Sequence, residues 1–301
     1  MKNIAVLLLA FGGPETLDEV EPFLRTLMEG RQVSDQQIKA IKERYRLIGG
    51  GSPLKSITYK QAQALELELN KDSSILYRVF VGMRYTPPFI EHAIEQVLLL
   101  GITDIIALPL TPYYNSASTG RYIQSLEKAI AGKDVKIRVI KSYNTNPFFI
   151  KAMAKGIKDT VKSINERFFI FSAHSLPVAM AKADSYVNQL EQTIRLIIKE
   201  TGITDYTLAF QSKGMAGDDW LGPDVKDVMD TCLKQGKRNI AIVPLGFVSD
   251  HVETLYDIDI VYRQYAESKG LDFLRVPSLN VSDYFIQALK EEIIKVWNDP
   301  L

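Results

Sequence analysis

The sequence is poor in cysteine and in net charge. One cysteine occurs in 301 residues, so a single chain can form neither an internal disulfide nor a zinc or iron–sulfur site built from several cysteines. Lys and Arg total 36, and Asp and Glu also total 36. This balance argues against nucleic acid as a partner, because binding to phosphates depends on excess positive charge. The scarcity of cysteine is typical of a reducing compartment, and we expect a cytoplasmic protein.

Long hydrophobic runs are equally scarce. No stretch approaches the roughly 18–20 apolar residues that a membrane-spanning helix requires. The apolar segment at residues 4–11 ends at Gly12-Gly13-Pro14, and an acidic segment follows it instead of a signal-peptide cleavage site. We therefore interpret residues 4–11 as a buried first strand. With 46% hydrophobic and 24% charged residues, the composition predicts a globular protein with little disorder.

Strand-like and helix-like segments alternate along the whole chain. Continuous runs of Val, Ile and Leu are typical of strands that are buried on both faces, as in a parallel sheet. Four such runs fall in each half of the sequence. They lie at residues 4–11, 77–83, 104–110 and 136–141, and then at 168–173, 206–211, 239–245 and 272–276.

The two halves also repeat one pattern of helix, glycine and strand. The segment Gly-Ile-Thr-Asp occurs at residues 101–104 and again at 202–205, each time just before a predicted strand. We therefore predict an α/β protein with two similar domains, each a four-stranded parallel sheet flanked by helices. The boundary is expected in the turn near residue 146, which gives domains 1–146 and 147–301. One continuous sheet is the alternative.

Two chemically versatile side chains follow predicted strands of the second domain. His174 comes after the strand at 168–173, and Glu253 comes shortly after the strand at 239–245. Because ligands bind at the carboxyl ends of parallel strands, these residues could meet across the mouth of the domain. A histidine can act as a base or metal ligand near neutral pH, whereas a structural residue at the strand end is the alternative. A buried carboxylate without a partner is costly, so Glu253 is expected to have a partner or a raised pKa.

Two further segments are candidates. If the segment around Glu253 is a helix, Asp257 shares the face of Glu253 and Asp250 caps the N-terminus; a solvated acidic surface is the alternative. The glycine-rich segment 49–53, Gly-Gly-Gly-Ser-Pro, matches neither common phosphate-binding signature. It is therefore either a loop that lets the backbone approach a flat ligand or a simple turn.

Taken together, seven segments resemble the ferrochelatase family, whose members insert ferrous iron into a porphyrin. They occur in the order of the family and extend over residues 9 to 257. The segments are LAFGGP at 9–14, RYRLIGGGSPL at 44–54, GMRY at 82–85, FSAHSLP at 171–177, QSK at 211–213 with WLGP at 220–223, and GFVSDHVETLYD at 246–257. The pair HSLP and DHVETLYD is specific, because chance agreement in both is negligible.

The resemblance implies a fold and a set of site residues. The family fold has two similar Rossmann-like domains with a porphyrin cleft between them, which agrees with the repeated strand pattern. By this resemblance, His174 and Glu253 are the catalytic residues that face the metal, and Asp257 continues an acidic track from Glu253. The residues expected beside the porphyrin are Phe11, Arg44, Tyr45, Ser52 and Tyr122. The N-terminal domain would then contact the porphyrin, and the C-terminal helix could pack across the domain boundary.

The residue types suit this reaction. Insertion of Fe²⁺ removes two pyrrole protons, which requires a base, and a carboxylate is a suitable ligand for a hard aqua ion. A cleft that binds a bent macrocycle would favour the transition state. Fe²⁺ and the porphyrin are both substrates, so we expect no resident cofactor, no iron–sulfur cluster and no nucleic acid partner. A monomer without a transmembrane segment is expected.

Several alternatives stay open at this stage. Relatives that use coproporphyrin often carry Tyr where this chain has Phe11, and their acidic track continues where this chain has Val261. Conversely, the segment at residues 30–45 is short, as in those relatives. The porphyrin is therefore either protoporphyrin IX or coproporphyrin III. A chelatase for another metal and tetrapyrrole is a second hypothesis, and a non-catalytic two-domain protein that binds a small molecule is a third.

Overall fold

The computed structural model describes residues 2–71, 73–213 and 219–299, and the chain folds as two compact units. The first unit comprises Met1–Leu110, Ala117–Ser142 and Asn280–Leu301, and the second comprises Thr111–Ser116 and Tyr143–Leu279. A single division between residues 146 and 147 was expected. Instead each unit is discontinuous, because the loop at 111–116 belongs with the second unit and the C-terminal segment belongs with the first.

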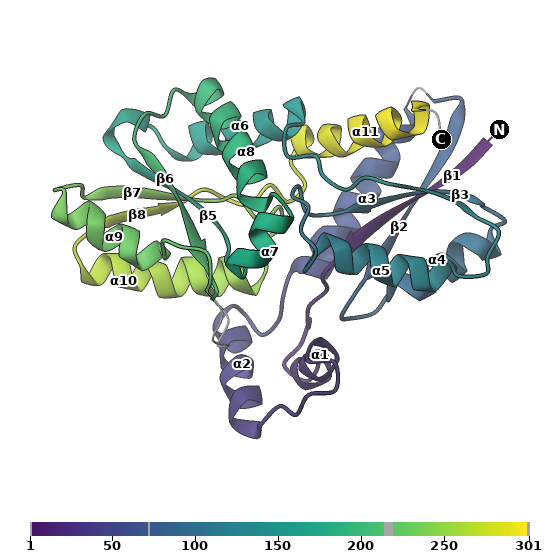
Figure 1. Ribbon diagram of the computed structural model, residues 1–301, viewed down its shortest axis with the longest axis horizontal. Helices are drawn as coiled ribbons and strands as arrows, with labels where there is room; N and C mark the ends of the chain where they lie inside the picture. Colours follow the sequence, from purple (N-terminus) through teal and green to yellow (C-terminus); the bar gives the residue numbers. More distant parts are fainter. Residues whose placement is uncertain (1, 72, 214–218, 300–301) are drawn as a thin grey trace. The chain divides into compact units, whose positions relative to one another are not determined.

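Each unit contains a four-stranded parallel sheet, and the strand order is the same in both (Figure 1). The first sheet has the order β2-β1-β3-β4, with strands β1 (Lys2–Ala10), β2 (Ile75–Met83), β3 (Asp104–Pro109) and β4 (Lys136–Val139). The second has the order β6-β5-β7-β8, with strands β5 (Phe168–His174), β6 (Tyr206–Gln211), β7 (Asn239–Pro244) and β8 (Asp272–Arg275). The predicted duplication and the α/β class are confirmed, and the alternative prediction of one continuous sheet is wrong.

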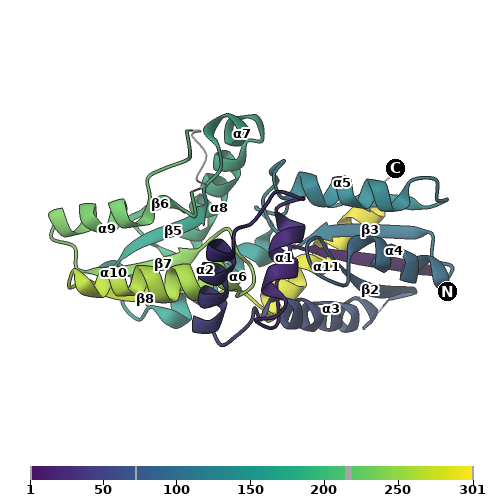
Figure 2. The same cartoon turned by 90° about the horizontal axis from the view of Figure 1, so that it is seen from below.

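Helices cover both faces of the first sheet, as the apolar runs predict. Residues 4–9 of β1 are fully buried. The helices of this unit are α1 (Val20–Leu27), α2 (Asp35–Leu47), α3 (Leu54–Asn70), α4 (Ile90–Leu99), α5 (Thr119–Ile130) and α11 (Asp283–Asn298). Helices α4 and α5 share a core with alternate residues of β1 and β3, whereas α3 and α11 pack on each other (Figure 2).

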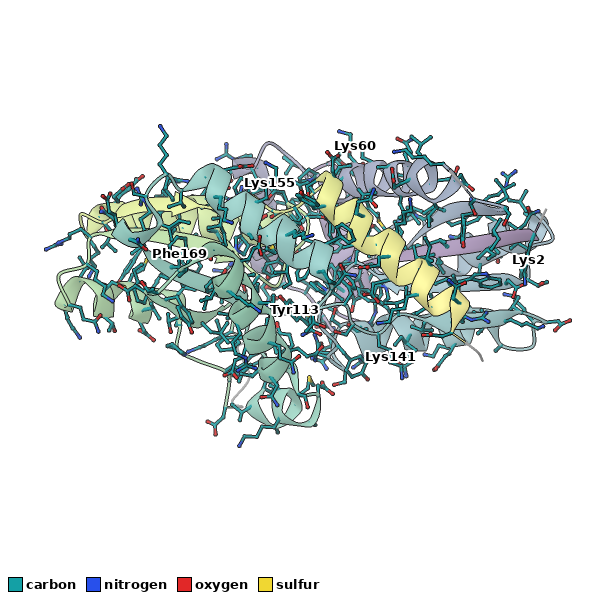
Figure 3. All side chains as sticks on the ribbon, turned by 90° about the horizontal axis from the view of Figure 1, so that it is seen from above. Lys2, Lys60, Tyr113, Lys141, Lys155 and Phe169 are labelled. Carbon is teal, nitrogen blue, oxygen red and sulfur yellow. The ribbon has the colours of Figure 1, made fainter. Side chains whose placement is uncertain are left out.

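The C-terminal helix α11 explains why the last segment belongs to the first unit. It contacts α3, β3 and β4, and Figure 3 shows it crossing the sheet of that unit. The ring of Trp297 on α11 lies 4.4 Å from Lys2 Nζ and 4.7 Å from the Arg138 guanidinium carbon. Cations over an aromatic face are attracted by the electron-rich ring, so Trp297 attaches α11 to β1 and β4.

The second unit is built in the same way. Its helices are α6 (Pro147–Thr160), the 3₁₀ turn η1 (Ile164–Glu166), α7 (Val178–Ala183), α8 (Tyr186–Thr201), α9 (Val225–Lys234), the π-helix η2 (Glu253–Tyr262) and α10 (Arg263–Ser268). Helices α6 and α8 pack together. Residues of α9, η2 and α10 share a core with β5, β6 and β7 on the other face (Figure 1). Among the described residues, no helix is long and apolar enough to cross a membrane.

Candidate active site

His174 is the last residue of β5, at the carboxyl end of the second sheet, where it pairs with Gln211 of β6. Its Nδ1 lies 2.6 Å from the carbonyl oxygen of Ser175. A carbonyl oxygen only accepts, so Nδ1 carries the hydrogen and donates it. Nε2 of the neutral ring therefore presents a lone pair, and with 38% of the side chain exposed the ring is accessible to a ligand.

Glu253 is the first residue of the π-helix η2, which follows β7. Its Oε2 lies 3.8 Å from His174 Nε2, and 28% of its side chain is exposed. This distance is too long for a direct hydrogen bond but short enough for both atoms to contact one ion. The structure thus brings together two residues that are far apart in the sequence, both within the second unit.

The segment around Glu253 is helical, but its form differs from the expected one. Residues Glu253–Tyr262 form a π-helix, and Val252, not Asp250, is the N-cap residue. Asp250 instead accepts a hydrogen bond from Arg275 Nη1 over 2.9 Å. Residues four apart still lie on nearly the same side of such a helix, which brings Asp257 to the side of Glu253.

Ser212 links the two carboxylates, and the sequence analysis assigned no role to this residue beyond its place in the QSK segment. Its hydroxyl lies 3.4 Å from Glu253 Oε2 and 3.4 Å from Asp257 Oδ2. Ser212 directly follows β6, so the rule that selected His174 and Glu253 could also have selected it. Its backbone has φ 60°, in the left-handed region that few residues other than glycine adopt. The partner expected for Glu253 is therefore present as Ser212 and His174.

Two buried tyrosines lie close to this pair. The hydroxyl of Tyr186 donates to the carbonyl oxygen of His174 over 3.4 Å, and this residue is 4% exposed. Burial, and secondly the charge of Glu253, raises the pKa of Tyr186. Burial also raises the pKa of Tyr262, with smaller effects from Asp224, Asp257 and Glu253. Both phenols therefore stay neutral near pH 7 and do not compete as anionic metal ligands.

The cation-binding capacity of the site is small. Within residues 2–71, 73–213 and 219–299, no group of three or more His, Cys, Asp or Glu side chains is placed to hold a metal ion. One imidazole and one carboxylate leave most coordination positions of a metal ion open. Such an arrangement suits the brief handling of an ion better than its permanent storage.

The expected porphyrin-contacting residues all lie in the first unit. Phe11 follows β1, is 39% exposed and packs its ring 4.6 Å from that of Tyr85. Ser52 is buried, and its N–H donates to the carbonyl of Pro14 over 2.7 Å, so Phe11 and Ser52 flank one loop. Tyr122 is 5% exposed and belongs to the core beneath the sheet. Burial raises the pKa of its phenol.

The other two expected contacts are on α2, with Arg44 exposed and Tyr45 buried. The glycine-rich segment that follows this helix packs against backbone of its own unit. A Cβ atom at Gly51 would lie 2.0 Å from the carbonyl oxygen of Glu15. Glycine at residue 51 is therefore required by the fold, which favours the turn interpretation for that position.

Comparison with known proteins gives consistent matches over the whole chain. The ferrochelatase family model matches residues 3–296. The ferrochelatase of Aquifex aeolicus (strain VF5) is 37% identical over 308 residues, which cover 96% of this chain and 98% of that protein. The coproporphyrin III ferrochelatase of Oceanobacillus iheyensis is 34% identical, with 98% and 97% covered. The solved structure of SirB from Bacillus subtilis with Fe³⁺ has a TM-score of 0.61 at 15% identity, covering 98% of this chain and 96% of that one; this likeness shows the fold alone.

Proposed function

The chain belongs to the ferrochelatase family, and on that premise we propose that it inserts Fe²⁺ into a porphyrin at the site formed by His174 and Glu253. One observation carries the proposal. His174 Nε2 and Glu253 Oε2 lie 3.8 Å apart, with both side chains partly exposed, at the sheet edge where α/β proteins bind ligands.

The two side chains supply what the reaction needs. Fe²⁺ enters the macrocycle as two pyrrole protons leave, so charge is conserved and a proton acceptor must stand near the nitrogens. Imidazole suits this role because it exchanges protons near neutral pH, and its Nε2 lone pair is available once Nδ1 donates to Ser175. The carboxylate of Glu253 is a suitable oxygen ligand for the incoming ion. Asp257, linked to Glu253 through Ser212, extends the acidic track along which the ion or the protons move.

The porphyrin contacts are part of the same proposal. Phe11 offers an exposed aromatic face beside the loop held by Ser52, and aromatic faces stack on flat macrocycles. Arg44 is exposed on α2 and suits the carboxylate substituents of a porphyrin. Tyr45 and Tyr122 are the remaining proposed contacts. Relatives named for ferrochelatase and for coproporphyrin III ferrochelatase match at similar identity, 37% and 34%, so the substrate test includes both protoporphyrin IX and coproporphyrin III.

The test is anaerobic single-turnover metallation, followed by the absorption spectrum of the product. The parent protein, His174→Ala and Glu253→Gln are each mixed with Fe²⁺ and one porphyrin. We expect the parent to metallate one porphyrin, and each variant to lose at least about a hundredfold in rate, as is usual when a proton-transfer group is removed. The matched control is His92→Ala, because His92 is an exposed histidine on α4 of the first unit.

The outcomes separate the competing functions. Near-parental rates in both folded variants would show that the site is assigned wrongly. A parent protein that metallates neither porphyrin with Fe²⁺ but accepts Co²⁺ or Ni²⁺ into another tetrapyrrole would favour a different chelatase. Tight porphyrin binding without metallation by any ion would favour a non-catalytic binding protein.

The composition supports a proposal about the cellular setting. We propose a cytoplasmic monomer with Fe²⁺ and the porphyrin as substrates and without a resident cofactor. The single cysteine supports a reducing compartment, and it leaves no cysteine set for an iron–sulfur cluster. Light scattering on the purified protein tests the monomer, and elemental analysis tests for bound metal.

A further inference from the structure

Arg275 holds two aspartates at once. It is the last residue of β8, and its side chain is 12% exposed. Its Nε donates to Asp259 Oδ1 over 2.7 Å, and its Nη1 donates to Asp250 Oδ1 over 2.9 Å. A guanidinium offers donors in a rigid planar fork, so the two carboxylates are fixed relative to each other in a way that a lysine ammonium does not reproduce.

In the sequence, the two aspartates flank the two carboxylates that we propose to handle the metal ion. In chain order the four acidic residues are Asp250, Glu253, Asp257 and Asp259. Asp250 lies in the loop before the π-helix η2, and Asp259 lies within that helix. π-helices are rare, occur as short segments and are frequent at functional sites. Through these two residues, Arg275 is hydrogen-bonded both to the loop before the helix and to the helix itself.

A second set of contacts lies beside the hydrogen bond between Arg275 and Asp250. Thr254 is fully buried, and its hydroxyl accepts from the backbone N–H of His251 over 3.0 Å. Two acceptors lie within reach of its single proton, the carbonyl oxygen of His251 at 3.0 Å and Asp250 Oδ1 at 3.3 Å. Thr254 directly follows Glu253. Asp250, which accepts from Arg275, therefore lies 3.3 Å from the hydroxyl of the residue next to Glu253.

Arg275 also balances the negative charge of the two aspartates. The side chains of Asp250 and Asp259 are 17% and 25% exposed, and Arg275 compensates both. Arg263 also lies near Asp259, but it is more distant, at 3.8 Å, and its side chain is more exposed, at 39%. Without Arg275, two partly buried carboxylates would add their repulsion to that between Glu253 and Asp257.

We infer that Arg275 is a positioning residue, which keeps Glu253 and Asp257 in the geometry that receives the metal ion. The inference rests on the proposed function of that pair. Arg275 itself does not face the reacting atoms in this account, because its donors are directed to Asp250 and Asp259. Its loss should therefore impair the handling of the cation and leave the binding of the porphyrin intact.

The experiment compares three variants of this network with one control. Arg275→Gln removes the ion pairs with both aspartates, and Arg275→Lys can keep one of them. Asp259→Asn weakens the pair with residue 259 and leaves Arg275 in place. The control is Arg167→Gln. Arg167 is 17% exposed and forms an ion pair with Asp272, which is the first residue of β8, whereas Arg275 is the last. For each protein we measure KM for Fe²⁺, KM for the porphyrin, the Kd for Zn²⁺ without porphyrin, and the Tm.

For Arg275→Gln we expect KM for Fe²⁺ and Kd for Zn²⁺ to rise about tenfold or more, as for other residues that orient metal ligands. KM for the porphyrin should not change. Arg275→Lys and Asp259→Asn should shift the metal constants in the same direction by less. Arg167→Gln should lower the Tm without changing the metal constants.

The opposite pattern would overturn the inference. If all three network variants lower the Tm but leave KM for Fe²⁺ and Kd for Zn²⁺ at parental values, Arg275 is only structural. A parent protein that binds Zn²⁺ but inserts no iron would contradict the proposed function, while the Zn²⁺ constants would still decide the role of Arg275. A parent that neither binds Zn²⁺ nor inserts iron would overturn both.

Discussion

The hydroxyl oxygen of Ser212 lies 3.4 Å from Oε2 of Glu253 and also 3.4 Å from Oδ2 of Asp257. A hydroxyl carries one proton, so it can donate to only one of the two carboxylates at a time. The two acids are thus joined through a single donor.

Replacing Ser212 by alanine should impair the acidic pair. Without the shared donor, the two carboxylates lose a hydrogen bond of 3.4 Å, and a typical hydrogen bond contributes about 0.5–1.5 kcal/mol. We expect Ser212→Ala to lower the rate of metallation at limiting Fe²⁺ by about tenfold, with porphyrin affinity unchanged. Ser125→Ala is the control, because Ser125 bonds only within the exposed part of α5. Equal initial rates for the two variants would contradict this account.

Gly51 should not tolerate even a methyl group. A Cβ atom there would lie 2.0 Å from the carbonyl oxygen of Glu15, so the loop must move and strain or lose the bond from Ser52 N–H to Pro14. We expect Gly51→Ala to lower the free energy of unfolding by about 1–3 kcal/mol, measured by urea denaturation.

Gly156 is the matched control for this substitution. It lies inside α6, and a Cβ there would make an ordinary 3.5 Å contact with Val276. Alanine favours a helix interior over glycine by about 0.5–1 kcal/mol, so Gly156→Ala should be neutral or stabilising. If both variants lost the same stability, crowding at Gly51 would not be the cause.

The single cysteine should be inert in the native protein. Cys232 on α9 is 1% exposed, and burial raises the pKa of its thiol to about 11. Since the thiolate is the reactive form, labelling by a thiol reagent at pH 8 should be at least about a hundredfold slower than in urea. Rapid labelling of the folded protein would show that α9 opens readily. Because no other thiol is present, the signal belongs to one residue.

Attachment of α11 to α3 should weaken in acid. Hydrogen bonds from Lys71, Gln287 and Lys290 lower the pKa of Glu68 from its ordinary 4.5 to about 2. A carboxyl with a depressed pKa in the folded state stabilises the protein above pH 4.5, and this contribution is lost as the pH falls towards 2. The difference in unfolding free energy between the parent and Glu68→Gln should therefore be constant above about pH 5 and shrink steadily below it.

Urea denaturation from pH 7 to pH 3 measures this difference. Glu127→Gln is the control, because Glu127 is an exposed residue of α5. A Glu68→Gln difference that does not vary with pH would mean that its bonds to α11 contribute nothing to stability in solution.

Local pattern was sufficient to predict most of the secondary structure. The strands lie close to the predicted bounds, because continuous Val, Ile and Leu runs are needed wherever a strand is covered on both faces. Helix α8 ends at Thr201 with Gly202 as its left-handed C-cap, as the glycine signal predicts. Local pattern could not predict to which unit α11 belongs, because this depends on tertiary contacts such as that of Trp297 with Arg138.

The candidate site was predictable in part. His174 and Glu253 stand out because each follows a strand of one repeated fold, and strand ends meet at one edge of a parallel sheet. Ser212 lies in the QSK segment and directly after a strand, but neither pattern shows that its hydroxyl lies between two carboxylates. Arg275 was not predicted, because an arginine within a strand carries no distinctive local pattern. Likewise, an i, i+4 spacing of acids suits both an α-helix and a π-helix, so the π form of η2 could not be anticipated.

The sequence by itself determined the repeated α/β plan, the strands and the residues with the chemistry for metal and proton transfer, because these depend on local apolar runs and side-chain type. Tertiary structure alone decided that Nε2 of His174 and Oε2 of Glu253 lie 3.8 Å apart, and that Arg275 and Ser212 hold the acidic segment between them. Those distances depend on the order of strands β5 to β8 and on the packing of η2. Both are set by contacts between residues that are far apart in the chain, so no local pattern encodes them.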